Sequence, residues 1–381
     1  MAEPEKHILE SRTGTKVVLN GKSYLYFAGT SYFQLHAHPE VIRAVNEATQ
    51  KYGTGPATTR SMTGTTPLLE QLEEKLATFF NTEDAVYIPS GYLSSLAGLK
   101  ALDEMGLFQM IFLDEESHYS LADGAASTGK KIVRFRSRDP DDLEAKLASH
   151  LEPGQHPLVA SDGLFPVTGT LAPIRDYLHL ASKHDGIVWV DDAHGVGILG
   201  VHGRGTCEAL GIHSKNLYLG ATLSKAFGAY GGLIAGPQEF IHKVRSGNVI
   251  TGSSSPMPAA VAAGIKGLEL IQEKQNLRKK LWENARYLRE SLLHMGIKSE
   301  EVYIPDIHGT IPIFSFEHRD AATMKLIHEL LMKEGIYTQY TTYHGAGSEG
   351  LLRIVVTSSH KKVEIVRLTH ALKEAIRSLS G

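Results

Sequence analysis

The sequence predicts an α/β protein with a large domain built on a mostly parallel seven-stranded sheet and a smaller α+β domain toward the C-terminus. Short apolar runs alternate with longer segments of helical period, as in parallel sheets covered by helices on both faces. After Pro258 the pattern changes to longer helical segments. The 381 residues also exceed what one core usually carries, which favours two domains around a shared cleft.

Seven apolar runs before Pro258 have the length of a buried strand. The predicted strands are Ala85–Ile88, Met110–Leu113, Lys131–Phe135, Pro157–Ala160, Ile187–Val190, Leu217–Leu219 and Gly232–Ala235. The predicted helices between them are Asp141–Leu151, Ile174–His184 and a helix that follows the turn at Ser90 and runs to about Leu102.

The elements expected after Pro258 are the helices Ala259–Lys274 and Asn276–Met295, the strand Ile311–Phe316, the helix Ala321–Glu334, a strand around Arg353 and a helix from Lys361. We therefore predict an N-terminal segment at 1–50, a large domain at 51–258, and a linking helix with the small domain at 259–381.

Composition and charge argue against several classes of protein. The net charge is −3, and no basic run with interleaved aromatic residues occurs, so we expect no nucleic-acid partner. No uninterrupted apolar stretch is long enough to span a bilayer, and Met1–Glu10 lacks a signal-peptide core. The single cysteine, Cys207, excludes an internal disulfide, and the scattered histidines show no metal-ligand spacing. We expect a cytoplasmic protein without a metal.

The chemistry-bearing residues follow two of the predicted strands. Lys225 lies among small residues shortly after the strand at Leu217, where partial desolvation favours the neutral amine that forms an imine. Asp191 follows the strand that begins at Ile187, at the carboxyl end where sites of α/β sheets gather. A lysine for the aldehyde and a carboxylate for the pyridine nitrogen are what pyridoxal phosphate requires.

A competing motif begins at Gly195, where the glycines at 195, 197 and 200 fit the dinucleotide-binding pattern. That pattern needs glycines directly at a strand-to-helix turn and an apolar helix beyond. Here Asp191 to His194 occupy the turn, and the chain continues as a glycine-rich loop. We therefore predict no dinucleotide site.

The chain resembles the α-oxoamine synthases, which are fold-type-I pyridoxal-phosphate enzymes. The resemblance extends from about Tyr32 to His360 and rests on the order and spacing of several motifs. These are Tyr52-Gly53-Thr54-Gly55 leading to Arg60 and Gly64, Ser90-Gly91-Tyr92, Asp114 to His118, Asp162-Gly163-Leu164-Phe165, Asp191-Asp192-Ala193-His194-Gly195, Thr222-Leu223-Ser224-Lys225, Ser253 to Pro258, and Arg353 with His360.

The resemblance assigns catalytic and cofactor-binding roles. It implies that Lys225 forms the imine and then moves the proton at the substrate α-carbon, and that Asp191 pairs with the ring nitrogen. It places His194 at the phenolic oxygen of the ring and His118 on the ring face, where His118 would also orient the acyl donor. Asp162 matches an acidic residue near the cofactor.

Further residues are implied for the phosphate, the substrate and a second subunit. The resemblance places the amides of Gly91 and Tyr92 and the hydroxyl of Thr222 at the phosphate. Ser254 matches a hydroxyl donated by the neighbouring subunit, which implies a homodimer with a shared active site. Arg353 is the expected clamp for the substrate carboxylate.

The expected reaction is the condensation of an amino acid with an acyl-CoA, with loss of carbon dioxide, to give an α-amino ketone. An aminotransferase on the same fold and a non-catalytic cofactor-binding module remain alternatives. The chain departs from the family pattern at Thr30, a substrate-binding position where asparagine is usual, at Leu69 in place of a histidine, and at Ser117 in place of an asparagine. The identities of the amino acid and of the acyl chain stay open.

Overall fold

The seven predicted strands form one sheet in the order β3-β9-β8-β7-β6-β4-β5. Their bounds are β3 (Asp84–Ile88), β4 (Met110–Asp114), β5 (Lys131–Phe135), β6 (Pro157–Asp162), β7 (Ile187–Asp191), β8 (Leu217–Thr222) and β9 (Gly232–Gly236). Strand β9 runs antiparallel to both neighbours, and the other pairs are parallel. The computed structural model describes residues 6–297, 310–316 and 320–379, and the prediction of a mostly parallel sheet is confirmed.

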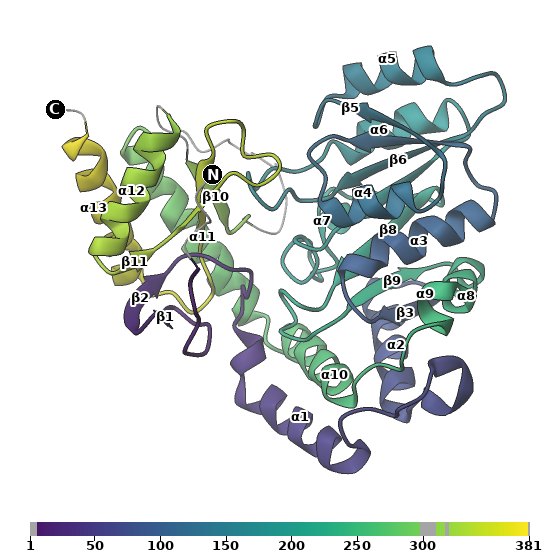
Figure 1. The fold of residues 1–381 in the computed structure, drawn as a ribbon, viewed down its shortest axis with the longest axis horizontal. Coiled ribbons are helices and arrows are strands. Elements are labelled where there is room, and N and C mark those ends of the chain that lie inside the picture. Colours follow the sequence, from purple (N-terminus) through teal and green to yellow (C-terminus); the bar gives the residue numbers. More distant parts are fainter. Residues whose placement is uncertain (1–5, 298–309, 317–319, 380–381) are drawn as a thin grey trace.

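Helices cover both faces of this sheet, which explains why its central strands are apolar throughout. Trp189 of β7 packs in one hydrophobic cluster with α3 (Tyr92–Glu104) and α8 (Gln238–Ser246). Its neighbours Val188 and Val190 point the other way, into a cluster with α5 (Pro140–His150) and α6 (Ile174–Ser182). Figure 1 shows these helices around the sheet of the large unit.

Strand β8 extends three residues beyond the predicted end at Leu219. Gly220, within this extension, lies against the indole of Trp189 on the neighbouring strand. A Cβ at this position would lie 2.7 Å from that indole. The absence of a side chain therefore lets a large core residue fill the space. The sequence prediction ended this strand too early because a Gly-Ala pair carries little strand propensity.

Proline begins several helices of the large unit. Pro39, Pro67, Pro140 and Pro258 stand at the first turn of α1 (Pro39–Tyr52), α2 (Pro67–Phe80), α5 and α10 (Pro258–Glu273). Proline suits this position because its missing N–H would have no intrahelical acceptor. The side chain of Asp139 also caps α5 by accepting from Asp142 N at 2.9 Å.

The second unit lies beside the large one in Figure 1 and contains two small sheets. Strand β13 (Leu351–Val355) pairs with β10 (Ile313–Phe316) and with β12 (Gln339–Thr341), all antiparallel. The covering helices are α11 (Asn276–His294), α12 (Ala321–Lys333) and α13 (Lys362–Ser378).

The N-terminal segment belongs spatially to this second unit. Strand β1 (Lys16–Leu19) pairs with β2 (Lys22–Tyr26), and β2 pairs in parallel with β11 (Ile336–Tyr337). Sequence analysis predicted none of these short strands. The segment boundaries at residues 50 and 258 stay a prediction.

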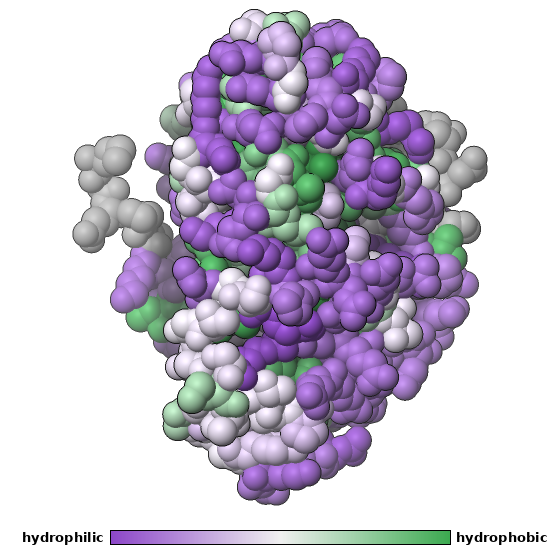
Figure 2. Space-filling model, turned by 90° about the vertical axis from the view of Figure 1, so that its right-hand side faces the viewer, coloured by the Kyte–Doolittle hydropathy of each residue, from purple (hydrophilic) through white to green (hydrophobic). Residues whose placement is uncertain are grey.

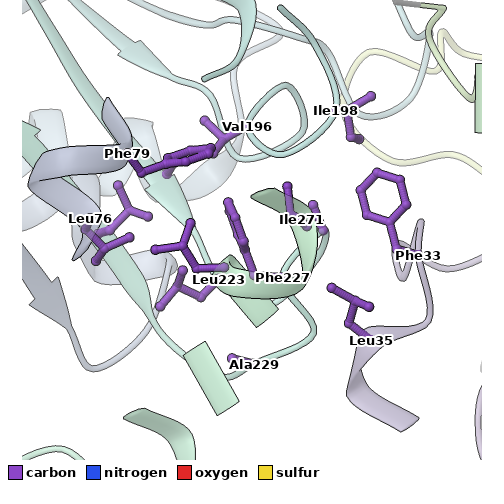
Figure 3. Close-up of a cluster of buried hydrophobic side chains, with 14 of the residues drawn as sticks. Phe33, Leu35, Leu76, Phe79, Val196, Ile198, Leu223, Phe227, Ala229 and Ile271 are labelled. Atoms are coloured by element: carbon purple, nitrogen blue, oxygen red, sulfur yellow. The ribbon is translucent and has the colours of Figure 1, made fainter. Parts of the chain in front are cut away.

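A continuous apolar cluster joins the N-terminal segment to the sheet (Figure 3). Phe33 and Leu35 of that segment belong to the same buried cluster as Phe79 of α2 and Phe227 of the loop after β8. The face of the molecule in Figure 2 is mostly hydrophilic, with apolar patches interrupted by polar side chains. Within the described ranges, no helix has both the length and the apolar composition needed to cross a membrane.

Candidate active site

A cavity of about 250 Å³ lies at the carboxyl ends of β6, β7 and β8. It brings together eight of the eleven predicted site residues, which are Gly91, Tyr92, His118, Asp162, Asp191, His194, Thr222 and Lys225. Ser90, Ser120, Leu164, Pro166, Ala193 and Ser224 complete its lining. Thr30, Ser254 and Arg353 are not among the lining residues.

The parallel register of the sheet places the two acidic residues side by side. Asp162 ends β6, Asp191 ends β7, and the two are paired across the strands. Asp191 Oδ1 accepts from Ala193 N at 3.1 Å, and Oδ2 accepts from Ser95 Oγ at 3.3 Å. Burial raises the pKa of Asp162 well above its usual range, and the charge of Asp191 adds to this increase. The pair therefore favours one negative charge over two.

Lys225 stands on a loop anchored in the hydrophobic core. Leu223 and Phe227, two positions to either side, are fully buried, and Figure 3 shows them in the core cluster. The lysine itself is half-buried. Burial lowers its pKa from 10.5 to about 8, although the carboxylates of Asp191 and Asp162 oppose this shift. A substantial neutral fraction near neutral pH is the property that imine formation requires.

His118 forms the N-cap of α4 (Tyr119–Ala126), and hydrogen bonds hold its ring. Its Nδ1 accepts from Ser120 N at 3.1 Å, and because a backbone N–H can only donate, Nδ1 carries no proton. Burial lowers the pKa of His118, which favours the neutral ring with its proton on Nε2. The backbone N–H of His118 donates to Asp162 Oδ1 at 3.2 Å.

The N-terminus of α3 forms another side of the cavity. Gly91 and Tyr92 begin this helix, where the first backbone N–H groups have no intrahelical acceptor and the helix dipole favours an anion. A Cβ on Gly91 would lie 2.5 Å from Thr222 Oγ1, so only glycine fits this approach. The hydroxyl of Thr222 donates to Gly231 O at 2.9 Å, so its proton is used within the chain. Donation from this hydroxyl to a phosphate would require that bond to be exchanged.

Arg353 lies behind the cavity wall. Its Nε donates to Pro166 O at 2.6 Å, and Pro166 lines the cavity. Its Nη1 donates to Gly29 O at 3.4 Å and to Gln339 Oε1 at 3.3 Å. The residue is 5% exposed, and no carboxylate of the described residues forms an ion pair with it.

The other two predicted residues and the departures lie in different surroundings. Thr30 is half-buried, whereas Ser254 is exposed and pairs with Thr59 through an isolated bridge. Leu69 is a core residue of α2, so the apolar side chain at this position has a packing role. The buried hydroxyl of Ser117 finds no hydrogen-bond partner in the described part of the chain.

Sequence reasoning missed residues that support the site from behind. Ser95 contacts Asp191, and Tyr32 contacts His194 through its hydroxyl. Asp192 is fully buried, accepts from both the backbone N–H and the hydroxyl of Thr206 at 2.6 Å, and has a pKa raised by burial to about 7. Asp192 belongs to a motif that gave it no role, and no local pattern pairs Ser95 with Asp191 or Tyr32 with His194, because these partners are distant in sequence.

The region after β7 has no dinucleotide-type helix. Residues 192–205 form neither helix nor strand, and the next helix is the short α7 (Thr206–Ala209). The glycines serve close approach: a Cβ on Gly195 would lie 2.2 Å from Asp192 Oδ1. The strand-to-helix turn that the dinucleotide pattern requires is absent from residues 192–205, and the absence of a dinucleotide site stays a prediction.

The chain is similar to known proteins over nearly its whole length. Residues 27–372 match the family model described as "Aminotransferase class I and II". The chain is 31% identical over 373 residues to 8-amino-7-oxononanoate synthase 1 of Bacillus velezensis, covering 97% of this chain and 93% of that protein. It is also 31% identical to serine palmitoyltransferase of Sphingobacterium spiritivorum, covering 92% of this chain and 86% of that one.

Two solved structures are also similar to this chain over nearly its whole length. A serine palmitoyltransferase variant from S. paucimobilis with a bound PLP–myriocin aldimine superposes with a TM-score of 0.90 at 26% identity, covering 98% of this chain and 93% of that chain. The 8-amino-7-oxononanoate synthase of Francisella tularensis has a TM-score of 0.78 at 21% identity, covering 94% and 99%, and supports the fold.

Proposed function

The chain belongs to the aminotransferase class I and II family and, within it, to the α-oxoamine synthases, and we propose that it condenses an amino acid with an acyl-CoA, releasing carbon dioxide to leave an α-amino ketone. The observation that carries this proposal is the convergence of Lys225, Asp191 and His118 on one cavity at the carboxyl edge of the sheet.

The cavity has the donor set that pyridoxal 5'-phosphate requires. Lys225 would hold the aldehyde carbon, Asp191 would face the ring nitrogen, and Gly91 with Tyr92 would bind the phosphate through the N-terminus of α3. The close approach of Gly91 to Thr222 leaves backbone amides rather than a side chain at that end. When bound, the protonated ring supplies an electron sink for charge that develops at the substrate α-carbon.

Lys225 and His118 divide the proton chemistry. An amine whose pKa is lowered to about 8 by burial can accept a proton near neutral pH and return it, so Lys225 suits proton transfer at the substrate α-carbon. His118 presents a neutral ring with its proton on Nε2, because Ser120 N occupies Nδ1. That N–H is a suitable donor to the carbonyl oxygen of the acyl thioester.

Arg353 supports recognition of the substrate carboxylate. A buried guanidinium whose described partners are neutral acceptors lacks a compensating anion, which is costly in a low-dielectric interior. A substrate carboxylate would supply that anion and would gain a charge-assisted hydrogen bond. Because Pro166 O connects Arg353 to the cavity wall, the carboxylate would bind at that side of the cavity.

We propose a homodimer with a shared active site on the basis of Ser254. This residue is exposed on its own chain and lies outside the cavity that holds Lys225. The surface near it carries the exposed apolar side chains Met62 and Met257, 76% and 54% accessible. Isologous contact between two copies would cover this surface and deliver each Ser254 to the other copy's site.

Mixed dimers test the sharing directly. As homodimers, the Lys225→Ala and Ser254→Ala variants each have reduced activity. In a hybrid dimer with one subunit of each variant, the subunit that keeps Lys225 faces a partner that keeps Ser254. One site is therefore intact if Ser254 acts on the neighbouring subunit. A monomer by light scattering, or a hybrid no more active than the mean of its parents, contradicts this proposal.

We also propose a cytoplasmic location, which is consistent with a single, buried cysteine at Cys207.

The reaction is tested by mixing the protein, loaded with pyridoxal phosphate, with glycine, alanine or serine and a series of acyl-CoA lengths. Release of free thiol together with carbon dioxide supports the condensation. Conversion of a keto acid without thiol release would instead establish the aminotransferase alternative. Lys225→Ala, if folded, abolishes either reaction, and its unchanged turnover would contradict the assignment of the site.

A further inference from the structure

His194 is held from behind by a tyrosine that is distant in the sequence. Tyr32 Oη and His194 Nδ1 are 2.7 Å apart, and 162 positions separate the two residues. Tyr32 is fully buried and His194 is 6% exposed, so water does not compete for this bond. The two rings meet edge to face, with centroids 6.3 Å apart and an interplanar angle of 74°.

The protein holds Tyr32 rigidly in this position. Its carbonyl accepts from Ser358 N at 2.9 Å, just beyond β13, and its N–H donates to Thr30 O at 3.1 Å. The next residue, Phe33, lies in the core cluster of Figure 3. These contacts hold the backbone of Tyr32 in place beside His194.

The charge states of the two groups determine the direction of the bond. Burial raises the pKa of Tyr32, so the phenol keeps its proton. Burial lowers the pKa of His194 well below its usual range, and the nearby cations of Lys225 and Arg353 lower it further, so the imidazole is neutral. A bare imidazole nitrogen is a better acceptor than a phenol oxygen, and the positive charge of Arg353 near the phenol strengthens it as a donor.

Resting on the cofactor site proposed above, we propose that Tyr32 is a positioning residue: its hydroxyl donates to Nδ1 of His194 and keeps the ring proton on Nε2. His194 lines the cavity, and in the described part of the chain no residue binds its Nε2. The ring thus presents a hydrogen-bond donor to a ligand. A donor suits the phenolic oxygen of pyridoxal phosphate, which carries negative charge, whereas the other tautomer would present a repelling lone pair.

Nitrogen NMR of the histidine side chains tests the tautomer without cofactor. In protein labelled with ¹⁵N-histidine, the signals of His194 are assigned by their loss in His194→Gln. We expect a bare Nδ1 and a protonated Nε2 in the parent protein, and a mixture of tautomers in Tyr32→Phe. A protonated Nδ1 in the parent protein, or an unchanged single tautomer in Tyr32→Phe, overturns the proposal.

Cofactor binding supplies the second readout. In Tyr32→Phe, the Nε2–H of His194 is no longer held as a donor to the phenolic oxygen of the cofactor. Pyridoxal-phosphate binding therefore weakens by about two- to tenfold, and the absorbance titration of the bound cofactor moves to higher pH. Tyr177→Phe is the matched control, because it removes another buried phenol hydroxyl, which donates to Asp114 Oδ2 at 3.2 Å, and Tyr177 lies in the hydrophobic cluster with α5 and α6, outside the cavity lining. It leaves both readouts unchanged, and equal effects of the two variants would refute a specific role for Tyr32.

The two experiments distinguish a failure of the proposed function from a failure of the Tyr32 role. If the parent protein binds no pyridoxal phosphate, the proposed function fails, while the ring-nitrogen measurement still decides the Tyr32–His194 pairing. If the cofactor binds and Tyr32→Phe matches the parent protein in the titration, the positioning role alone is refuted.

Discussion

The amine of Lys225 should react with electrophiles as a group of pKa about 8. At pH 7 such an amine is about 9% neutral, whereas an ordinary lysine of pKa 10.5 is about 0.03% neutral, a difference of about 300-fold. The experiment varies the pH. Because burial disfavours the charged form, the neutral fraction should rise about tenfold for each pH unit below 8 and level off above it.

Competitive labelling measures this directly. Limiting acetic anhydride is added to the cofactor-free protein at a series of pH values, and mass spectrometry follows the peptide that contains Lys225. Exposed lysines serve as internal references and keep gaining reactivity to above pH 10. A Lys225 profile parallel to theirs would refute the desolvation argument.

The neighbouring carboxylate gives a second test of the same reasoning. Asp191 raises the pKa of Lys225 against the effect of burial, so Asp191→Asn should move the labelling midpoint below pH 8. Asp176→Asn, an equal change of charge at an exposed position of α6, should leave it in place. A labelling midpoint that rises in Asp191→Asn would contradict the conclusion that the Asp191 carboxylate raises the pKa of Lys225.

Three further predictions concern the phosphate end, the core and the substrate clamp. Gly91→Ala places a Cβ 2.5 Å from Thr222 Oγ1, so pyridoxal-phosphate affinity should fall at least tenfold by fluorescence titration. Phe227→Ala empties a fully buried site in the core of Figure 3 and should cost about 3–5 kcal/mol in urea unfolding, whereas Tyr230→Ala, at an exposed position, should change stability by no more than about 0.5 kcal/mol. Arg353→Gln should raise the KM for the amino acid by about 10- to 150-fold, the range for a hydrogen bond to a charged group, with a smaller effect on cofactor affinity.

Matched controls keep these outcomes specific. Gly14→Ala adds a Cβ that meets only ordinary van der Waals contacts, so equal losses of affinity in Gly14→Ala and Gly91→Ala would contradict the phosphate assignment. Arg377→Gln removes an exposed guanidinium paired with Glu374, and its KM should match that of the parent protein. An Arg353→Gln enzyme with an unchanged amino-acid KM would exclude Arg353 as the carboxylate clamp.

Local patterns predict the sheet and place Lys225 and Asp191 after two of its strands, whereas most of the other site residues follow from the resemblance to the family. Strands such as β6 and β7 are covered on both faces, so they read as continuous apolar runs, and each ends in an aspartate. Because parallel strands present their carboxyl ends at one edge, Asp162 and Asp191 had to lie close together. The short strands β1 and β11 escaped prediction, because their stability comes from pairing rather than from their own periodicity.

The order of the motifs along the chain determined the family, local apolar runs determined the strands of the main sheet, and the residues around Lys225 single it out as the proposed reactive lysine. Only the tertiary structure decided that Tyr32 contacts His194, that Arg353 stands behind Pro166, and how far the pKa of Lys225 falls. Those properties arise from burial and from contacts between distant segments. Such contacts exist only once the core has excluded water, and no local sequence pattern encodes them.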